Sequence, residues 1–181
     1  EPAAIRSHNW RGYSLASGLV RQTTGTSIFY ALSDDKNTNG VIDTGDDFVM
    51  TEYSINDPSA IPVTEFHQRI NSQTAAAQSY GLASVNFLNR DNEVLFTGEP
   101  DGQLFAWTAT GATNPLQRQL FSSQHAGKAW HALAGVKTLE PGEGLIGLRV
   151  DPISPNKCEV ILWSPQPQLP QLASLPNTAP A

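Results

Sequence analysis

Short runs of apolar, β-branched and aromatic residues recur along this chain, and Gly, Pro, Asn or Asp bounds each of them. Runs of this kind predict β-strands. The clearest strands are expected at residues 27–32, 47–53, 93–97, 103–108, 145–150 and 159–163. Helical periodicity is almost absent, and the best helical candidate, residues 72–80, is short and rich in Ala and Gln. The pattern therefore predicts an all-β protein.

The expected strands fall into three similar units when they are aligned with one another, at residues 13–70, 79–122 and 128–175. The third strand of each unit carries an aromatic residue, and these residues, Tyr53, Trp107 and Trp163, are 54 and 56 positions apart. A period of about 50 residues with four strands per unit is typical of propeller blades. We therefore expect three four-stranded antiparallel blades.

These blades would form a β-domain over residues 1–163. The remaining segment, residues 164–181, contains five of the 13 prolines, which is typical of an extended strap or linker. A fourth strand of the third unit would fall inside this segment, at residues 169–175.

The second unit has the most regular sequence. Residues 85–97 read VNFLNRDNEVLFT, and Asp101-Gly102 and the run QLFAW at 103–107 follow. This segment resembles the blade motif of TolB-like propellers, in which an apolar strand and an apolar-aromatic strand flank an Asp-Gly turn. The resemblance covers one clear blade and two degenerate copies, and it departs from the motif at Leu88-Asn89, where Ser-Pro is usual. It implies an architecture and no particular activity.

Three blades are too few to close a ring, which needs about four to eight. Three arrangements remain open on the sequence alone. The chain is part of a larger propeller, or two copies associate as three plus three blades, or the strands pack as a single β-sandwich of the same size. Exposed blade edges would favour aggregation, so the first two arrangements imply a partner.

A loop between two expected strands has the spacing D-x-N-x-N-G-x-x-D. Calcium takes six to eight oxygen ligands, and alternate side chains of a tight loop can supply them. The expected ligands are the side chains of Asp35, Asn37, Asn39, Asp43 and Asp46 and the carbonyl of Val41. The loop resembles an EF-hand loop, but its twelfth position is Asp46 rather than Glu and no helices flank it. The sequence predicts a structural Ca²⁺ on a β-hairpin, although the same residues also favour a turn without an ion.

Composition narrows the class of protein. The net charge is −6, with acidic residues concentrated between Asp34 and Asp57, which argues against a nucleic-acid partner. Charged residues make up only 15% of the chain, as in many secreted or periplasmic β-proteins, so we expect an extracytoplasmic location. The single cysteine, Cys158, excludes an internal disulfide and is expected to be buried. No apolar run is long enough for a membrane span.

No catalytic motif stands out, because neither H-E-x-x-H nor G-x-S-x-G occurs. The segment around Trp130 carries His125 and His131, and these three residues are candidate ligand-binding residues, although a core position for the indole is the simpler interpretation. A carboxylate pair made by Glu65 with Glu99 or Asp101 is the only catalytic hypothesis.

We therefore expect a non-catalytic binding or scaffold protein that acts through contacts with another protein chain or with a second copy. Two alternatives stay open. One is an accessory or partial catalytic propeller of a carbohydrate-active enzyme. The other is a lectin-like sugar-binding module.

Overall fold

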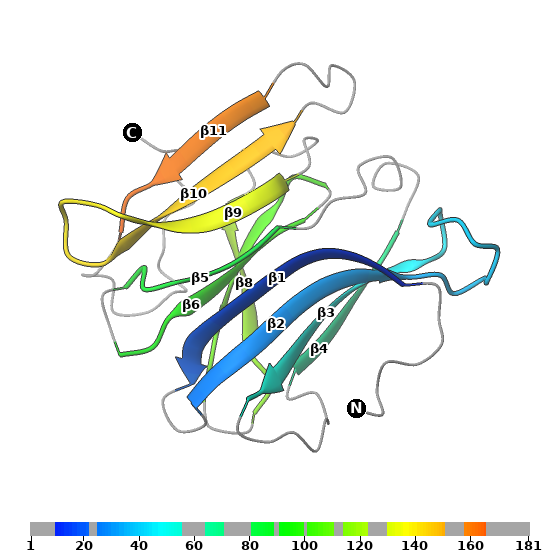
Figure 1. Cartoon of the computed structure of the whole chain (residues 1–181), viewed down its shortest axis with the longest axis horizontal. Helices are drawn as coiled ribbons and strands as arrows, with labels where there is room; N and C mark the ends of the chain where they lie inside the picture. Colours follow the sequence, from blue (N-terminus) through cyan, green and yellow to red (C-terminus); the bar gives the residue numbers. More distant parts are fainter. Residues whose placement is uncertain are drawn as a thin grey trace.

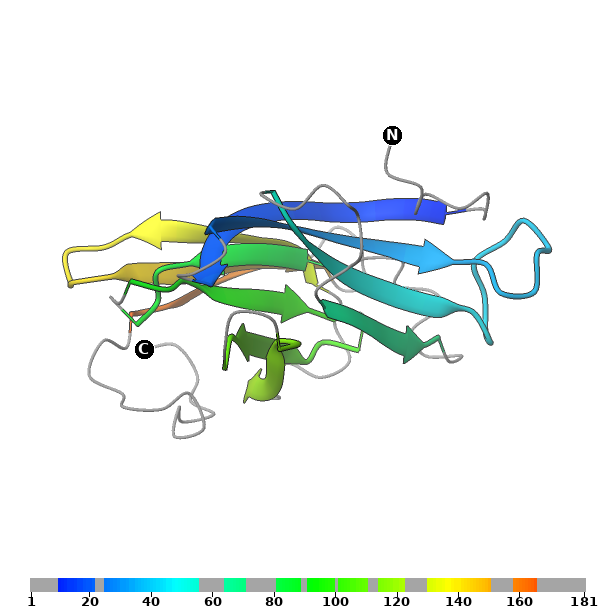
Figure 2. The same cartoon turned by 90° about the horizontal axis from the view of Figure 1, so that it is seen from below.

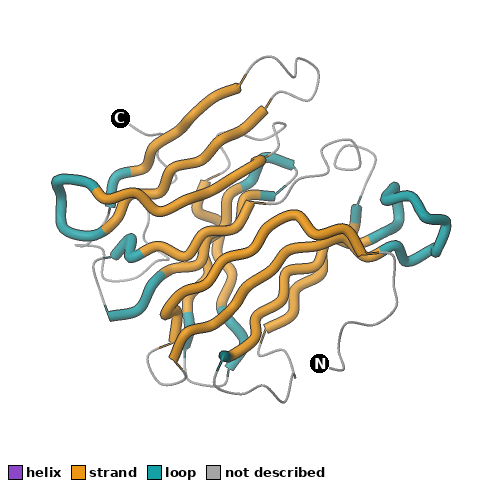
Figure 3. Tube along the Cα trace, viewed as in Figure 1, coloured by secondary structure: helices purple, strands orange, loops and turns teal. Residues whose placement is uncertain are grey.

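The computed structural model describes residues 10–21, 25–55, 64–70, 81–88, 91–99, 101–110, 114–122, 130–150 and 158–165. These residues form eleven β-strands and no helix, which confirms the predicted all-β class (Figure 3). The strands belong to three antiparallel sheets of four, four and three strands. Among the described residues, no helix is long and apolar enough to span a membrane.

Each sheet is a meander of consecutive strands (Figure 1). Sheet A contains β1 (Trp10–Arg21), β2 (Gly25–Asp34), β3 (Asp47–Ser54) and β4 (Thr64–Arg69). Sheet B contains β5 (Gly81–Val85), β6 (Val94–Gly98), β7 (Leu104–Thr108) and β8 (Gln117–Ser122). Sheet C contains β9 (Trp130–Lys137), β10 (Glu143–Val150) and β11 (Cys158–Trp163). The expected fourth strand of the third unit, at 169–175, and the helical candidate at 72–80 lie outside the described residues.

The sheets are stacked in three layers with sheet B in the middle. One hydrophobic cluster joins sheet A to sheet B and includes Phe29, Phe48, Leu95 and Trp107. A second cluster, with Phe96, Phe121, Trp130, Leu145 and Trp163 among its members, joins sheet B to sheet C. Sheet B is thus covered on both faces, which explains why β6 is buried along its whole length.

The first strands of successive sheets lie beside one another. Strand β5 contacts both β1 and β9. Figure 2 shows β1 and β9 on one side of the molecule and β4 and β8 on the opposite side. Gly18 permits the close approach of β1 to β5, because a Cβ at this position would lie 1.9 Å from Ser84 Oγ.

We call the face of a sheet that points toward the next sheet along the chain its back, and the opposite face its front. The back of sheet A packs on the front of sheet B, and the back of sheet B packs on the front of sheet C. The front of sheet A and the back of sheet C therefore point away from the other two sheets.

The expectation that Cys158 is buried is wrong, because its side chain is exposed. Cys158 pairs with Val150 at the start of β11 and lies on the same face as Val160 and Leu162. This face is the back of sheet C, and no described strand covers it. The apolar run of β11 indicated burial, but only the alternate residues Ile161 and Trp163 point into the core.

Candidate metal loop between β2 and β3

The loop predicted to bind calcium, residues 35–46, connects β2 to β3 and projects beyond the end of sheet A (cyan in Figure 1). Its base is fixed in two ways. The side chain of Ile42 is buried in the cluster between sheets A and B. The backbone of Ile70 accepts a hydrogen bond from Gly45 N at 3.0 Å and donates one to Asp46 O at 2.8 Å. The loop is therefore an extension of a folded hairpin.

Asp35 organises the first half of the loop. Its buried carboxylate accepts hydrogen bonds from Asn39 N at 3.2 Å and from Gly40 N at 2.7 Å. The backbone must turn sharply to bring these two amides round, and both Thr38 (φ 58°) and Gly40 (φ 83°) are left-handed. Glycine adopts this conformation without strain, which explains its place at the sixth position.

Asp46 closes the loop from its other end. Its carboxylate is fully buried and accepts hydrogen bonds from Lys36 N at 2.9 Å and from Asp43 N at 2.8 Å. The first and last predicted ligands are thus both buried and both held by backbone amides.

The three remaining predicted side-chain ligands contact one another. Asn37 Nδ2 lies 3.2 Å from Asp43 Oδ1, and Asn39 Nδ2 lies 3.0 Å from Asp43 Oδ2. The side-chain oxygen Oδ1 of Asn39 accepts a hydrogen bond from Val41 N at 2.7 Å. The amide groups of the two asparagines therefore donate to the Asp43 carboxylate, which is the group that would face a cation.

The donor types fit a hard cation, because carboxylate and amide oxygens are the ligands that Ca²⁺ takes. In the described part of the chain, no group of three or more His, Cys, Asp or Glu side chains is arranged to hold a metal ion. The oxygen donors of this loop come instead from a mixture of Asp and Asn. An ion held here would replace the Asn37 and Asn39 amide groups as the partners of Asp43.

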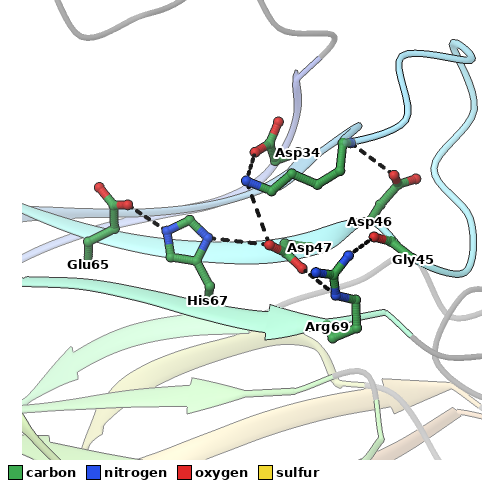
Figure 4. Close-up of polar contacts among 8 residues, drawn as sticks. Asp34, Gly45, Asp46, Asp47, Glu65, His67 and Arg69 are labelled. Carbon is green, nitrogen blue, oxygen red and sulfur yellow. Dashed lines mark hydrogen bonds and ion pairs between the residues drawn. The ribbon is translucent and has the colours of Figure 1, made fainter.

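A charged network lies at the base of the loop, on the front of sheet A (Figure 4). Lys36 Nζ is 2.7 Å from Asp34 and 3.7 Å from Asp47. Arg69 Nε is 3.2 Å from Asp47 and Arg69 also donates to Gly45 O. The hydrogen bond to Asp34 raises the pKa of Lys36.

The same network continues along the edge strand β4. His67 Nδ1 lies 3.6 Å from Asp47, and His67 Nε2 contacts Glu65. Glu65, His67 and Arg69 alternate along β4 and share one face of sheet A. This set was not predicted, although the charged residues at 65, 67 and 69 have the period of two that places side chains on one face of a strand.

The loop and its base carry an excess of negative charge. Five carboxylates (Asp34, Asp35, Asp43, Asp46 and Asp47) face two permanent cations, Lys36 and Arg69, which leaves −5 + 2 = −3. Such an excess attracts a cation to this end of sheet A.

Trp130 has no exposed surface. Its indole packs on Trp163, with 5.4 Å between ring centroids, and its Nε1 donates to Gly102 O at 3.0 Å. The ring therefore offers no face for stacking on a sugar, and it has the core position that was the simpler interpretation. His131 is exposed beside it, and His125 lies outside the described residues.

Glu65 and Glu99, which form one of the two candidate catalytic pairs, do not face one another. Glu65 is on the front of sheet A, whereas Glu99 is buried at the end of β6 and pairs with Arg118, whose guanidinium lies over the Phe66 ring on the back of sheet A. Burial raises the pKa of Glu99 from 4.5 to about 7, although the charge of Arg118 opposes this rise. Arg118 is also stacked on Phe105 of the neighbouring strand β7, 3.3 Å from the ring centroid. Its contact with Phe66 is the one that joins sheet B to sheet A.

No family model, curated protein or solved structure matches this chain. The resemblance to TolB-like blades therefore stays a prediction from the sequence pattern.

Proposed function

We propose that this chain is a non-catalytic binding or scaffold module, a three-blade segment of a TolB-like propeller that acts through protein–protein contacts. In this proposal one structural Ca²⁺ stabilises the loop between β2 and β3. The low content of charged residues, 15%, supports an extracytoplasmic location.

The observation that carries the proposal is the apolar surface at the two ends of the stack. On the back of sheet C, the paired strand positions that point away from sheet B are apolar up to the exposed Cys158: Ala132, Ala134, Val136, Ile146, Leu148, Val160 and Leu162. The exposed His131 lies beside them, in the bulge of β9 between Trp130 and Ala132. Val160 is 65% exposed and Leu162 is 46% exposed. An apolar sheet face of this extent marks an interaction surface.

The front of sheet A is apolar along β1 and β2, whereas its β4 side carries the charged residues Glu65, His67 and Arg69. Leu15 is 72% exposed on β1, and Ile28, Tyr30 and Leu32 are half-buried on β2. Tyr30 stacks on Tyr53 of β3, with 5.6 Å between ring centroids. Both ends of the stack can therefore receive a further sheet, as the ends of an incomplete propeller would.

The proposed Ca²⁺ would be held by Asp35, Asn37, Asn39, Asp43, Asp46 and the Val41 carbonyl. Two buried carboxylates and a net local charge of −3 support it. An ion at this position would fix the loop against the base of sheet A, and none of the contacts of the loop suggests a reaction.

The accessibility of Cys158 tests the proposal, because this single thiol lies on the back of sheet C. At low chain concentration, the folded chain should react with a thiol reagent nearly as fast as the denatured chain. Slow labelling of the dilute folded monomer would mean that the chain covers this face itself, and would contradict a role as an open-ended module.

A further inference from the structure

The contacts between successive sheets follow one pattern. A row of three paired residues crosses the front of each sheet: Ser17, Ile28 and Tyr53 in sheet A, Ser84, Leu95 and Trp107 in sheet B, and Gly135, Leu145 and Trp163 in sheet C. Each row places a small residue, an aliphatic residue and an aromatic residue on the first, second and third strands. The three fronts therefore share one row of equivalent positions.

The rows of sheets B and C are covered by the sheet before them. Leu95 and Trp107 are buried against sheet A, where Trp107 packs on Phe66 of β4. Leu145 and Trp163 are buried against sheet B, where Trp163 packs on Phe121 of β8. In both cases the aromatic residue of the row meets a phenylalanine on the fourth strand of the preceding sheet.

A second contact also repeats. Glu93 joins sheet B to β1, because its backbone N donates to Leu19 O at 2.9 Å and its carboxylate accepts from Leu19 N at 3.0 Å. Glu143 joins sheet C to the end of β5 through the same pair of bonds to Asn86, at 3.0 and 3.1 Å. Each glutamate lies two residues before the aliphatic residue of its row.

At each end of the stack, one sheet face has no neighbouring sheet among the described residues to continue this pattern of contacts. The row of sheet A, with Ile28 and Tyr53 half-buried, has no preceding sheet among the described residues. The back of sheet C, with Val160 and Leu162 exposed, has no following sheet among them. Lys137 on β9 is the counterpart of Leu19 and Asn86, and Thr26 on β2 is the counterpart of the two glutamates.

We propose that a second copy of this chain fills both places, with the front of sheet A of each copy packed on the back of sheet C of the other. This inference rests on the proposed function, whose partner it identifies. Two three-sheet chains give six sheets, which lies within the roughly four to eight that close a ring. A two-fold axis makes both contacts at once, so the closed pair leaves neither apolar face open.

The side chains of the two faces are also complementary in size. The back of sheet C is low along β9, where Ala132 and Ala134 stand, and the front of sheet A carries the larger side chains of Leu15, Ile28 and Tyr30. The backs of sheets A and B likewise have alanine on their first strands, at Ala16 and Ala83, in the contacts that are already formed.

The test is the mass of the chain in solution, measured by light scattering over a range of concentrations. The expected result is a concentration-dependent dimer of twice 19.5 kDa, with slower labelling of Cys158 as the dimer forms. Val160→Glu places a charge on the back of sheet C, and Leu15→Lys places a charge on the front of sheet A. Each substitution therefore alters one side of the proposed contact. Each should raise the dissociation constant at least about thirtyfold, the equivalent of about 2 kcal/mol. Leu139→Lys, in the fully exposed turn after β9, is the control and should change nothing.

Mixing the two variants makes the test specific for this geometry. A mixed pair contains one contact with both substitutions and one with neither, so mixing Leu15→Lys with Val160→Glu should restore the dimer that each variant has lost. Thr26→Glu should act in the opposite direction, because it supplies the missing glutamate opposite Lys137, and it should lower the dissociation constant about tenfold.

Each result separates this inference from the proposed function. A monomer at every concentration with fast labelling of Cys158 would overturn the second-copy contact and leave the open faces for another protein. A dimer that neither substitution weakens, or that mixing does not restore, would also overturn it. A monomer in which Cys158 is protected would overturn both.

Discussion

The indole of Trp107 packs edge-on against the ring of Phe66, with 5.2 Å between ring centroids, and this contact joins the middle sheet to the first. Trp107 also donates from Nε1 to Thr97 Oγ1 at 2.9 Å, so its polar atom is satisfied within sheet B. A large aromatic side chain with a satisfied polar group is a strong anchor for two packed layers. The stacking of sheets A and B should depend on it.

Trp107→Ala should lower the free energy of unfolding by about 3–5 kcal/mol, because it removes a fully buried aromatic side chain from the interface. Urea unfolding of the monomer measures this change. Tyr53→Ala is the matched control, since Tyr53 has the same place in its row but is only half-buried, and it should cost less than half as much. Equal costs for the two variants would mean that Trp107 does not join the layers.

A buried ion pair holds the end of sheet A that is opposite the loop. Arg21 Nε lies 2.8 Å from Glu52 Oε1 and Arg21 Nη2 lies 2.9 Å from Glu52 Oε2, and Ser27 and Thr64 donate to the same carboxylate at 2.9 and 2.6 Å. Both charged side chains are almost completely buried. The carboxylate therefore links all four strands of sheet A.

Glu52→Gln should destabilise the chain by about 3–5 kcal/mol, because it leaves the guanidinium of Arg21 buried without its counter-charge. Glu65→Gln on the exposed face of β4 is the control, and its effect should stay within about 0.5 kcal/mol. Denaturant unfolding of both variants at neutral pH measures the difference. If the two substitutions cost the same, the Arg21–Glu52 pair contributes nothing beyond a surface pair.

The strands of this fold were predictable because their local patterns are strong. The Asp-Gly turn before β7 is one example, since Gly102 has a φ of 87° that favours glycine. The partners of buried charges were not predictable, because Arg21 and Glu52 are 31 residues apart and meet only through the register of β1 to β4. Cys158 was wrongly predicted to be buried for a related reason. An apolar strand is buried on both faces only when a sheet lies on each side of it, and the sequence alone does not say which sheet is the last.

The pKa of Glu99 gives stability a dependence on pH. Burial raises this pKa from 4.5 to about 7 in the folded chain. The folded chain then holds a proton that the unfolded chain loses between these values, so the free energy of unfolding falls as pH rises from 4.5 through 7. A shift of this size corresponds to about 3 kcal/mol.

Glu99→Gln should remove that dependence, because the amide does not ionise. The free energy of unfolding of Glu99→Gln minus that of the parent chain should therefore be larger at pH 8 than at pH 5. Urea unfolding at both pH values measures this difference. Glu140→Gln changes an exposed acid in the turn between β9 and β10 and should keep the pH dependence of the parent. A stability difference between parent and Glu99→Gln that is the same at pH 5 and pH 8 would contradict the raised pKa.

The calcium site proposed in the loop between β2 and β3 implies that Ca²⁺ should stabilise the folded chain. If the loop holds one Ca²⁺, an excess of the ion of about a hundredfold over its dissociation constant should stabilise the chain by about 2.7 kcal/mol relative to chelator. Asp43 is the group that contacts both asparagines, at 3.2 and 3.0 Å, so Asp43→Asn should remove most of the gain and leave the fold intact.

Glu140→Gln is the control, because it neutralises an exposed acid in the turn between β9 and β10, far along the chain from the loop. It should keep the full gain, which thermal unfolding with calcium and with chelator measures. A parent chain that is equally stable in both conditions would remove the metal from the proposal. The hydrogen bonds of Asp35 and Asp46 would then account for the loop by themselves, since both buried carboxylates already have backbone amides as partners.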